Sequence, residues 1–167
     1  MKDMWIVSKT EATKIFHTSQ GYQVSAVVSI GDPNEKPPTG MRARERAILR
    51  MEFHDVDRND EGYVRFGIVP PNKIDIKKLI RSAKALIDTP NVLLIHCYAG
   101  ISRSTTTGFI LKAIELGAGH EQEAFDFVKE KCPWMSPNSL MIFIAQAELP
   151  EFDIISPLKN WQKLNKL

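Results

Sequence analysis

Residues 92–104 read Val92-Leu93-Leu94-Ile95-His96-Cys97-Tyr98-Ala99-Gly100-Ile101-Ser102-Arg103-Ser104, and this stretch decides the expected fold. Its first four residues are all apolar, which is typical of a strand that is buried on both faces of a sheet. A turn containing glycine follows, and the mostly apolar residues 104–116 then predict a helix. The stretch therefore indicates a strand, a tight loop and a helix, with Cys97 where the strand ends.

The segments on either side alternate between strand and helix patterns. β-Branched residues or apolar–polar alternation predict strands, and apolar residues at helical spacing predict helices. The predicted strands span 22–30 and 47–54, and the predicted helices span 75–88, 121–131 and 137–148. This alternation is typical of an α/β fold with a central, mostly parallel sheet flanked by helices.

The chain length suits one domain. Its 167 residues are enough for a single core, so we expect one domain over 1–167, with residues 151–167 as a peripheral tail. No apolar run approaches the ~20 residues of a membrane span, and the start of the chain carries Asp3, so no membrane segment or signal peptide is expected. The net charge of +2 gives no case for nucleic-acid binding.

The two cysteines, Cys97 and Cys132, make no disulfide framework, so we expect a reducing, cytoplasmic location. Cys132 lies before a proline at the end of a predicted helix and is expected to be a structural, apolar residue. The histidines lack the spacing of metal ligands, so neither a metal nor a cofactor is expected. The sequence carries no indication of an oligomeric state.

The loop from Cys97 to Arg103 has the chemistry of an anion site. Ligands bind at the carboxyl ends of strands in open α/β sheets, and helix N-termini attract anions. Arg103 carries a planar guanidinium suited to phosphate, and Ser104 can donate a hydrogen bond to a thiolate. A tight turn can also direct backbone amides toward a bound anion, so the expected binding residues are Tyr98, Ala99, Gly100, Ile101, Ser102 and Arg103.

These residues resemble the signature loop of the cysteine-based protein tyrosine phosphatase superfamily. In that loop, His-Cys is followed by five residues, an Arg and then a Ser or Thr, and His96-Cys97 and Arg103-Ser104 complete the pattern here. The resemblance implies a phosphate monoester hydrolase in which Cys97 forms a cysteinyl-phosphate intermediate and Arg103 is catalytic. It gives His96 and Ser104 supporting roles.

The wider chain, from about residue 49 to residue 148, is similar to the compact dual-specificity branch in length and element order. The sequence Ser136-Pro137-Asn138 before the last predicted helix is similar to a Pro-Asn element of that branch. The similarity is weak in the first forty residues and in the tail.

The resemblance also implies a general acid, an Asp on a separate loop after a strand. Asp55 fits best because a predicted strand ends directly before it; Asp57 is the alternative and Asp60 comes third. A positioned acid contributes ~10²–10⁴-fold to such a reaction. The separation from Cys97 is long for the compact branch, so residues 59–71 are expected to be an insertion near the site.

The substrate is expected to be a phosphorylated protein or peptide, with tyrosine or dual specificity. The inner loop positions carry no charge, whereas lipid phosphatases of the superfamily tend to carry lysines there; these positions are Tyr98, Ala99, Ile101 and Ser102. One alternative is a phosphatase for small-molecule, nucleotide or lipid phosphates. The other is a non-catalytic module that binds phosphorylated ligands.

Overall fold

Strand β4 (Val92–Cys97) lies inside a four-stranded sheet in the computed structural model, which describes residues 3–165. The strand order is β1-β4-β2-β3, and every neighbouring pair is parallel. The other strands are β1 (Asp3–Ser8), β2 (Val24–Gly31) and β3 (Ala47–Glu52). The predicted α/β class with a parallel central sheet is therefore confirmed.

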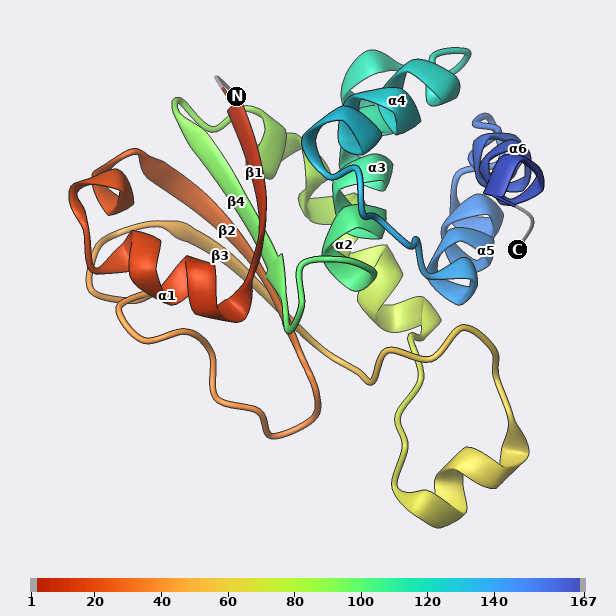
Figure 1. Ribbon diagram of the computed structural model, residues 1–167, viewed down its shortest axis with the longest axis horizontal. Coiled ribbons are helices and arrows are strands. Elements are labelled where there is room, and N and C mark those ends of the chain that lie inside the picture. The colour runs from red at the N-terminus through yellow and green to blue at the C-terminus, as the bar shows by residue number, and fades with distance from the viewer. Residues whose placement is uncertain (1–2, 166–167) are drawn as a thin grey trace.

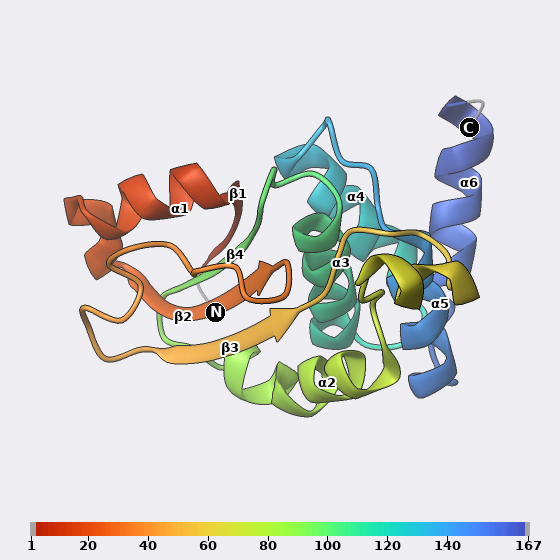
Figure 2. The same cartoon turned by 90° about the horizontal axis from the view of Figure 1, so that it is seen from below.

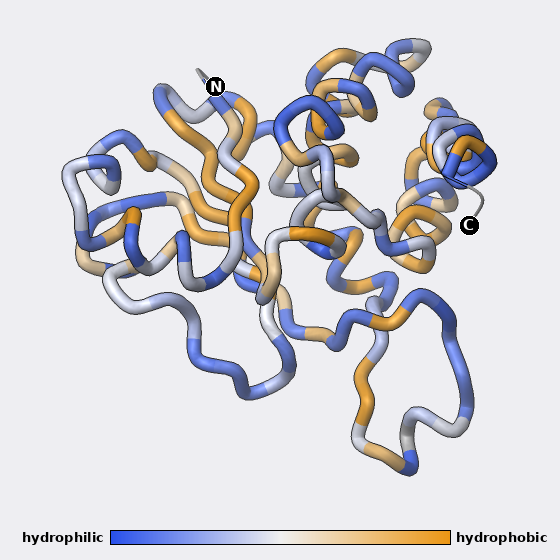
Figure 3. Tube along the Cα trace, in the orientation of Figure 1, coloured by the Kyte–Doolittle hydropathy of each residue, from blue (hydrophilic) through white to orange (hydrophobic). Residues whose placement is uncertain are grey.

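The apolar run that predicted a doubly buried strand does occupy such a position. All six residues of β4 are buried, because β1 and β2 flank it and helices cover both of its faces. Hydrophobic stretches run along the strands of the sheet (Figure 3).

Helices lie on both faces of the sheet (Figures 1 and 2). On one face, α1 (Lys9–Phe16) covers a small core, and a short 3₁₀ helix, η1 (Ser19–Tyr22), follows it. On the other face, α2 and α3 pack directly on the strands over the main core, and α4, α5 and α6 pack outside them. These helices span Lys73–Ile87 (α2), Arg103–Leu116 (α3), Glu121–Lys131 (α4), Ser139–Glu148 (α5) and Ile155–Asn165 (α6).

The predicted strands and helices are all present, with ends shifted by a few residues at most. No prediction was made for β1 and α1, which are short and lie where the chain carries little periodicity. The segment 151–167, expected to be a peripheral tail, includes α6, and Leu158 in its first turns is 1% exposed. Residues 1–2 and 166–167 of the predicted domain lie outside the described range. Among the described residues, no helix has the length and apolar character needed to cross a bilayer.

The parallel sheet brings the carboxyl ends of all four strands to one edge. Ser8 pairs with Cys97 across β1 and β4, and Gly31 pairs with Glu52 across β2 and β3. The loops that follow these strands therefore converge, as they do in other open α/β sheets. Between β3 and α2, the chain makes a long excursion that includes η2 (Glu61–Phe66) and projects from the body of the molecule (Figure 1).

Candidate active site

The loop of residues 97–103, predicted above to be the catalytic loop and called so below, wraps around the sulfur of Cys97. The Gly100 N–H donates to Sγ at 3.3 Å, and the Ser104 hydroxyl lies 3.2 Å from the same atom. The Cys97 residue is 1% exposed, so its thiol lies at the base of the loop rather than at the surface. A sulfur that accepts from a backbone N–H and lies within hydrogen-bond distance of a hydroxyl is placed to carry negative charge.

Gly100 allows this turn because its φ is +76°, a conformation that side chains disfavour. A Cβ at this position would lie 2.7 Å from the backbone nitrogen of Ser8, so the loop packs closely on the end of β1. The Lys9 N–H also donates to the Tyr98 carbonyl at 3.2 Å. The end of β1 and the start of α1 thus support the back of the loop.

Arg103 begins α3, and it is 3% exposed. Its Nη1 donates to Asp32 Oδ1 at 2.7 Å and to the Phe53 carbonyl at 2.6 Å. Its buried Nε has no hydrogen-bond partner within residues 3–165. One end of the guanidinium is therefore fixed by the loops after β2 and β3, while Nε keeps a free donor for an anion.

The start of α3 is also open to an anion. The Ser102 hydroxyl makes no capping bond to the first turn of α3; it donates to Asp55 Oδ1 at 2.7 Å instead. Uncapped N–H groups at a helix start carry partial positive charge and attract phosphate.

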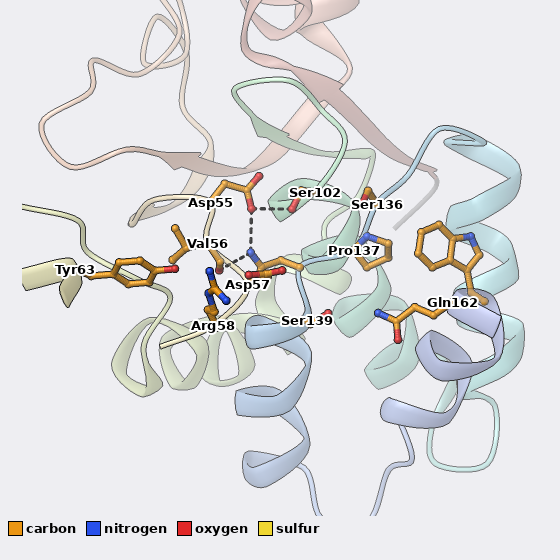
Figure 4. A pocket seen from close by; sticks show the side chains of 12 residues that line it. Asp55, Val56, Asp57, Arg58, Tyr63, Ser102, Ser136, Pro137, Ser139 and Gln162 are labelled. Atoms are coloured by element: carbon orange, nitrogen blue, oxygen red, sulfur yellow. Dashed lines mark hydrogen bonds between the residues drawn. The ribbon is translucent and has the colours of Figure 1, made fainter. Parts of the chain in front are cut away.

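Asp55 lies beside this loop, although it comes from the segment after β3. Its Oδ1 accepts from the Ser102 hydroxyl (Figure 4) and from Asn138 Nδ2, the latter at 2.9 Å. Its Oδ2 lies 3.8 Å from Arg103 Nε. The side chain is 35% exposed. It thus has access to solvent and to a ligand held in the loop.

Asn138 joins the Asp55 segment to the helical layer. Besides Asp55, its Nδ2 donates to the Val56 carbonyl at 2.9 Å, and its Oδ1 accepts from the Met141 N–H at 2.9 Å as the N-cap of α5. Its own N–H donates to Thr106 Oγ1 at 2.8 Å. One buried amide therefore fixes both Asp55 and the start of α5.

The other two candidate acids lie away from the loop. Asp57 is exposed and lines an outer cavity beyond Asp55. Asp60 is exposed too, and its Oδ1 accepts from the Gly62 N–H at 2.7 Å within its own turn.

His96 lies behind the loop in a polar network. Its Nε2 is 2.8 Å from Ser29 Oγ, which also accepts from Arg50 Nη1 at 2.9 Å, and Arg50 Nη2 donates to the Glu35 carbonyl at 2.7 Å. Burial lowers the pKa of His96 to about 4. The imidazole is therefore neutral near pH 7 and supports the loop from below.

Comparisons with known proteins agree with this geometry. No protein-family model matches the chain. Tyrosine-protein phosphatase pmp1 of Schizosaccharomyces pombe is 42% identical over 53 residues, which cover 30% of this chain and 18% of that protein. Human dual specificity protein phosphatase 16 is 44% identical over 61 residues, which cover 35% of this chain and 8% of that protein. The matches thus span less than a fifth of these relatives.

Solved structures resemble the chain over almost its whole length. Human DUSP28 has a TM-score of 0.63 at 16% identity and covers 96% of this chain and 94% of its own. DUSP15 has a TM-score of 0.63 at 19% identity, and the match covers 99% of this chain and 92% of DUSP15. The Yvh1 phosphatase domain of Chaetomium thermophilum has a TM-score of 0.58 at 17% identity, and the match covers 88% of this chain and 90% of that domain.

Over 30–35% of its length, this chain is therefore similar in sequence to a tyrosine-protein phosphatase and a dual specificity protein phosphatase. Its fold is that of the compact, dual-specificity-like branch.

Two cavities flank Asp55. The inner one, about 460 Å³, lies over the catalytic loop and is lined by Asp32, His54, Asp55, Val56, Ile68, Tyr98, Ala99 and Arg103. The outer one, about 550 Å³, extends from Asp55 and Ser102 to Gln162 of α6 (Figure 4). The C-terminal helix of this chain therefore forms one wall of the outer cavity.

The structure gathers the sequence-predicted residues 96–104 and Asp55 into one site. It adds Asp32 and Asn138, which were not predicted to act there. Asp32 lies two residues after the end of the predicted strand 22–30, so the convergence of parallel strand ends could have indicated its position. Asn138 belongs to the Pro-Asn element noted in the sequence, but its contact with Asp55 arises only in the folded chain.

Two further predictions concern cysteine and metal chemistry. Cys132 is 1% exposed, its Sγ lies 3.9 Å from the Ile6 carbonyl, and burial raises the pKa of its thiol. Within the part of the chain that the structure describes, no group of three or more His, Cys, Asp and Glu side chains could hold a metal ion.

Proposed function

We propose that this chain hydrolyses phosphate monoesters through a cysteinyl-phosphate intermediate. The observation that carries the proposal is the position of Cys97 Sγ inside the catalytic loop, where it is hydrogen-bonded to the Gly100 N–H and the Ser104 hydroxyl. Arg103 supports it, because its Nε is a buried donor with no partner among the described residues. A buried, unpaired donor of this kind is costly, and a phosphoryl oxygen would satisfy it.

In the first step, the Cys97 thiolate attacks phosphorus and the bond from phosphorus to the ester oxygen breaks. Arg103 and the loop N–H groups stabilise the charge on the three transferred oxygens. Asp55, in its carboxylic acid form, donates a proton to the departing oxygen. The products are an alcohol or phenol and a phosphoryl group bound to sulfur.

In the second step, water attacks phosphorus and the sulfur–phosphorus bond breaks. Asp55, now a carboxylate, accepts the proton of the water. The sulfur leaves as a thiolate, and the Ser104 hydroxyl at 3.2 Å is placed to donate to it. Inorganic phosphate then dissociates and the enzyme returns to its starting state.

The proposed substrate is a phosphorylated protein or peptide, with an aryl phosphate favoured. Val56, Ile68 and Tyr98 give the inner cavity apolar walls, which suit an aromatic ring. A structure of similar fold is PTPMT1 in complex with PI(5)P, so the fold alone does not select the substrate. Here the charged lining of the cavity includes the carboxylates of Asp32 and Asp55, which disfavour additional phosphates.

The test is hydrolysis of an aryl phosphate by the reduced chain at mildly acidic pH. We expect Cys97→Ser to abolish turnover but to retain binding of a phosphate analogue, because the loop amides and Arg103 remain. Cys132→Ser is the matched control and should retain turnover. Vanadate binding by the parent chain without any turnover would favour a phospholigand-binding module instead. A reducing compartment, proposed to be the cytoplasm, would keep Cys97 in its thiol form.

A further inference from the structure

The 54–69 loop leaves the sheet after β3 and returns to the point where it began (Figure 1). Two hydrogen bonds close it, and both involve His54. The His54 N–H donates to the Val69 carbonyl at 2.7 Å, and the Val69 N–H donates to His54 Nδ1 at 2.9 Å. The imidazole and the backbone of one residue thus hold both ends of the loop together.

This loop supplies much of the catalytic pocket. Asp55 and Val56 follow directly after His54, and Ile68 precedes Val69; all three line the inner cavity. Inside the loop, the Ile68 N–H donates to the Tyr63 carbonyl at 3.0 Å. A change at the His54–Val69 pair would therefore move both Asp55 and the apolar wall formed by Ile68.

We propose that His54, through its Nδ1 acceptor, is a positioning residue for Asp55 and Ile68, a role that rests on the proposed phosphatase function. A backbone N–H can donate to Nδ1 only when Nδ1 carries no proton. When the imidazole is protonated, Nδ1 becomes a donor that faces another donor, so this hydrogen bond is lost. The loop is then held by the remaining bond between His54 N–H and the Val69 carbonyl.

Other polar and charged groups lie near His54, and a test has to separate their effects. Those that line the same cavity are Asp32 after β2, Asp55 on the loop itself, Arg103 at the start of α3 and Tyr98 on the catalytic loop. Each remains in every His54 variant. A ratio of rates between parent and variant therefore isolates the contribution of the imidazole.

Three substitutions distinguish the acceptor atom from the rest of the side chain. His54→Ala removes the acceptor. His54→Asn places a carbonyl oxygen at the position of Nδ1, and His54→Gln places one a bond farther from the backbone. If Nδ1 positions the loop, His54→Asn restores most of the function that His54→Ala and His54→Gln lose.

The assay is the rate of hydrolysis across a series of aryl phosphates whose phenols differ in acidity. Hydrolysis of esters with poor leaving groups depends most on Asp55. Near pH 7 we therefore expect His54→Ala to slow these esters about five- to tenfold, as loss of one hydrogen bond predicts. Esters with the best leaving groups should slow less than about twofold. His120→Ala, at the exposed histidine that is the N-cap of α4, is the matched control and should leave the rates for all leaving groups unchanged.

Two results would overturn the proposal. One is an equal fall in rate for all leaving groups, which would indicate a general structural effect. The other is equal impairment of His54→Asn and His54→Ala, which would exclude the acceptor role.

Amide hydrogen exchange at Val69 separates this proposal from the proposed function, since it needs no turnover. We expect Val69 to exchange about five- to tenfold faster in His54→Ala than in the parent, as loss of its acceptor predicts. Equal protection of Val69 in both proteins would refute the pairing. A parent chain that hydrolyses no phosphate ester would refute the proposed function alone.

Discussion

Replacing Asn138 tests how the helical layer holds Asp55 over the catalytic loop. The side chain makes three hydrogen bonds, to Asp55, to the Val56 carbonyl and from the Met141 N–H. Loss of the N-cap bond costs about 1 kcal/mol. The bond to Val56 contributes about 1 kcal/mol, and the bond to the partly exposed Asp55 about the same after solvent screening.

We therefore expect Asn138→Ala to lower the free energy of unfolding by about 3 kcal/mol, and the melting temperature by roughly 6–12 °C. Asn138→Ser is the matched variant, because serine is also a good N-cap but lacks the amide donor. It should lose about 2 kcal/mol, since the two bonds from Nδ2 are absent. Urea unfolding of the parent and both variants at neutral pH measures these differences.

Kinetics separates the role of Asn138 in the site from its role in α5. Both variants free Asp55 from its amide donor, so both should slow the hydrolysis of poor leaving groups by about tenfold, as expected when a general acid is poorly positioned. The reasoning is refuted if Asn138→Ala changes the free energy of unfolding by less than about 0.5 kcal/mol, the size expected of an ordinary surface substitution. It also fails if Asn138→Ser hydrolyses poor leaving groups as fast as the parent.

Three other predictions concern the acid, the loop and its support. Asp55→Asn should slow aryl ester hydrolysis by about 10²-fold or more and remove the fall in kcat on the alkaline side of the pH profile. The same result from Asp57→Asn, with Asp55→Asn unaffected, would make Asp57 the general acid. Gly100→Ala should abolish most turnover and reduce stability measurably in urea, because its φ is +76° and its new Cβ would lie 2.7 Å from Ser8 N; an active, equally stable variant would contradict the loop geometry. The pKa of His96 is lowered from an ordinary 6.5 to about 4, so between these pH values the unfolded chain binds a proton that the folded chain does not. The free energy of unfolding should therefore be highest above about pH 6.5 and fall by up to about 3 kcal/mol toward pH 4. His96→Asn should flatten that part of a stability profile measured by urea unfolding, and an unchanged slope would argue against a buried neutral imidazole.

The sequence predicted the centre of the fold and much of the site because local patterns coincide there. The apolar run before Cys97 predicts a buried strand, and the spacing from Cys97 to Arg103 predicts a loop that ends at a helix. Asp55 could be expected because it follows a strand in the same sheet. These features depend on neighbours in the chain, so they are visible without a structure.

The contacts that were not predicted depend on residues far apart in the chain. Asp32 reaches Arg103 because β2 and β4 are adjacent, and Asn138 reaches Asp55 across 83 positions. The adjacency of strands is a tertiary property that no local pattern specifies. The first strand and helix were missed because short terminal elements derive much of their stability from packing on the rest of the sheet.

The central claim is that Cys97 receives the phosphoryl group within the loop of residues 97–103. Rapid acid quenching of the enzyme during turnover of an aryl phosphate, followed by mass spectrometry of its peptides, measures this directly. We predict one phosphoryl group on the peptide that contains Cys97, and none in Cys97→Ser. Sustained turnover with no phosphoryl group on Cys97, or with the group on another residue, would contradict the account.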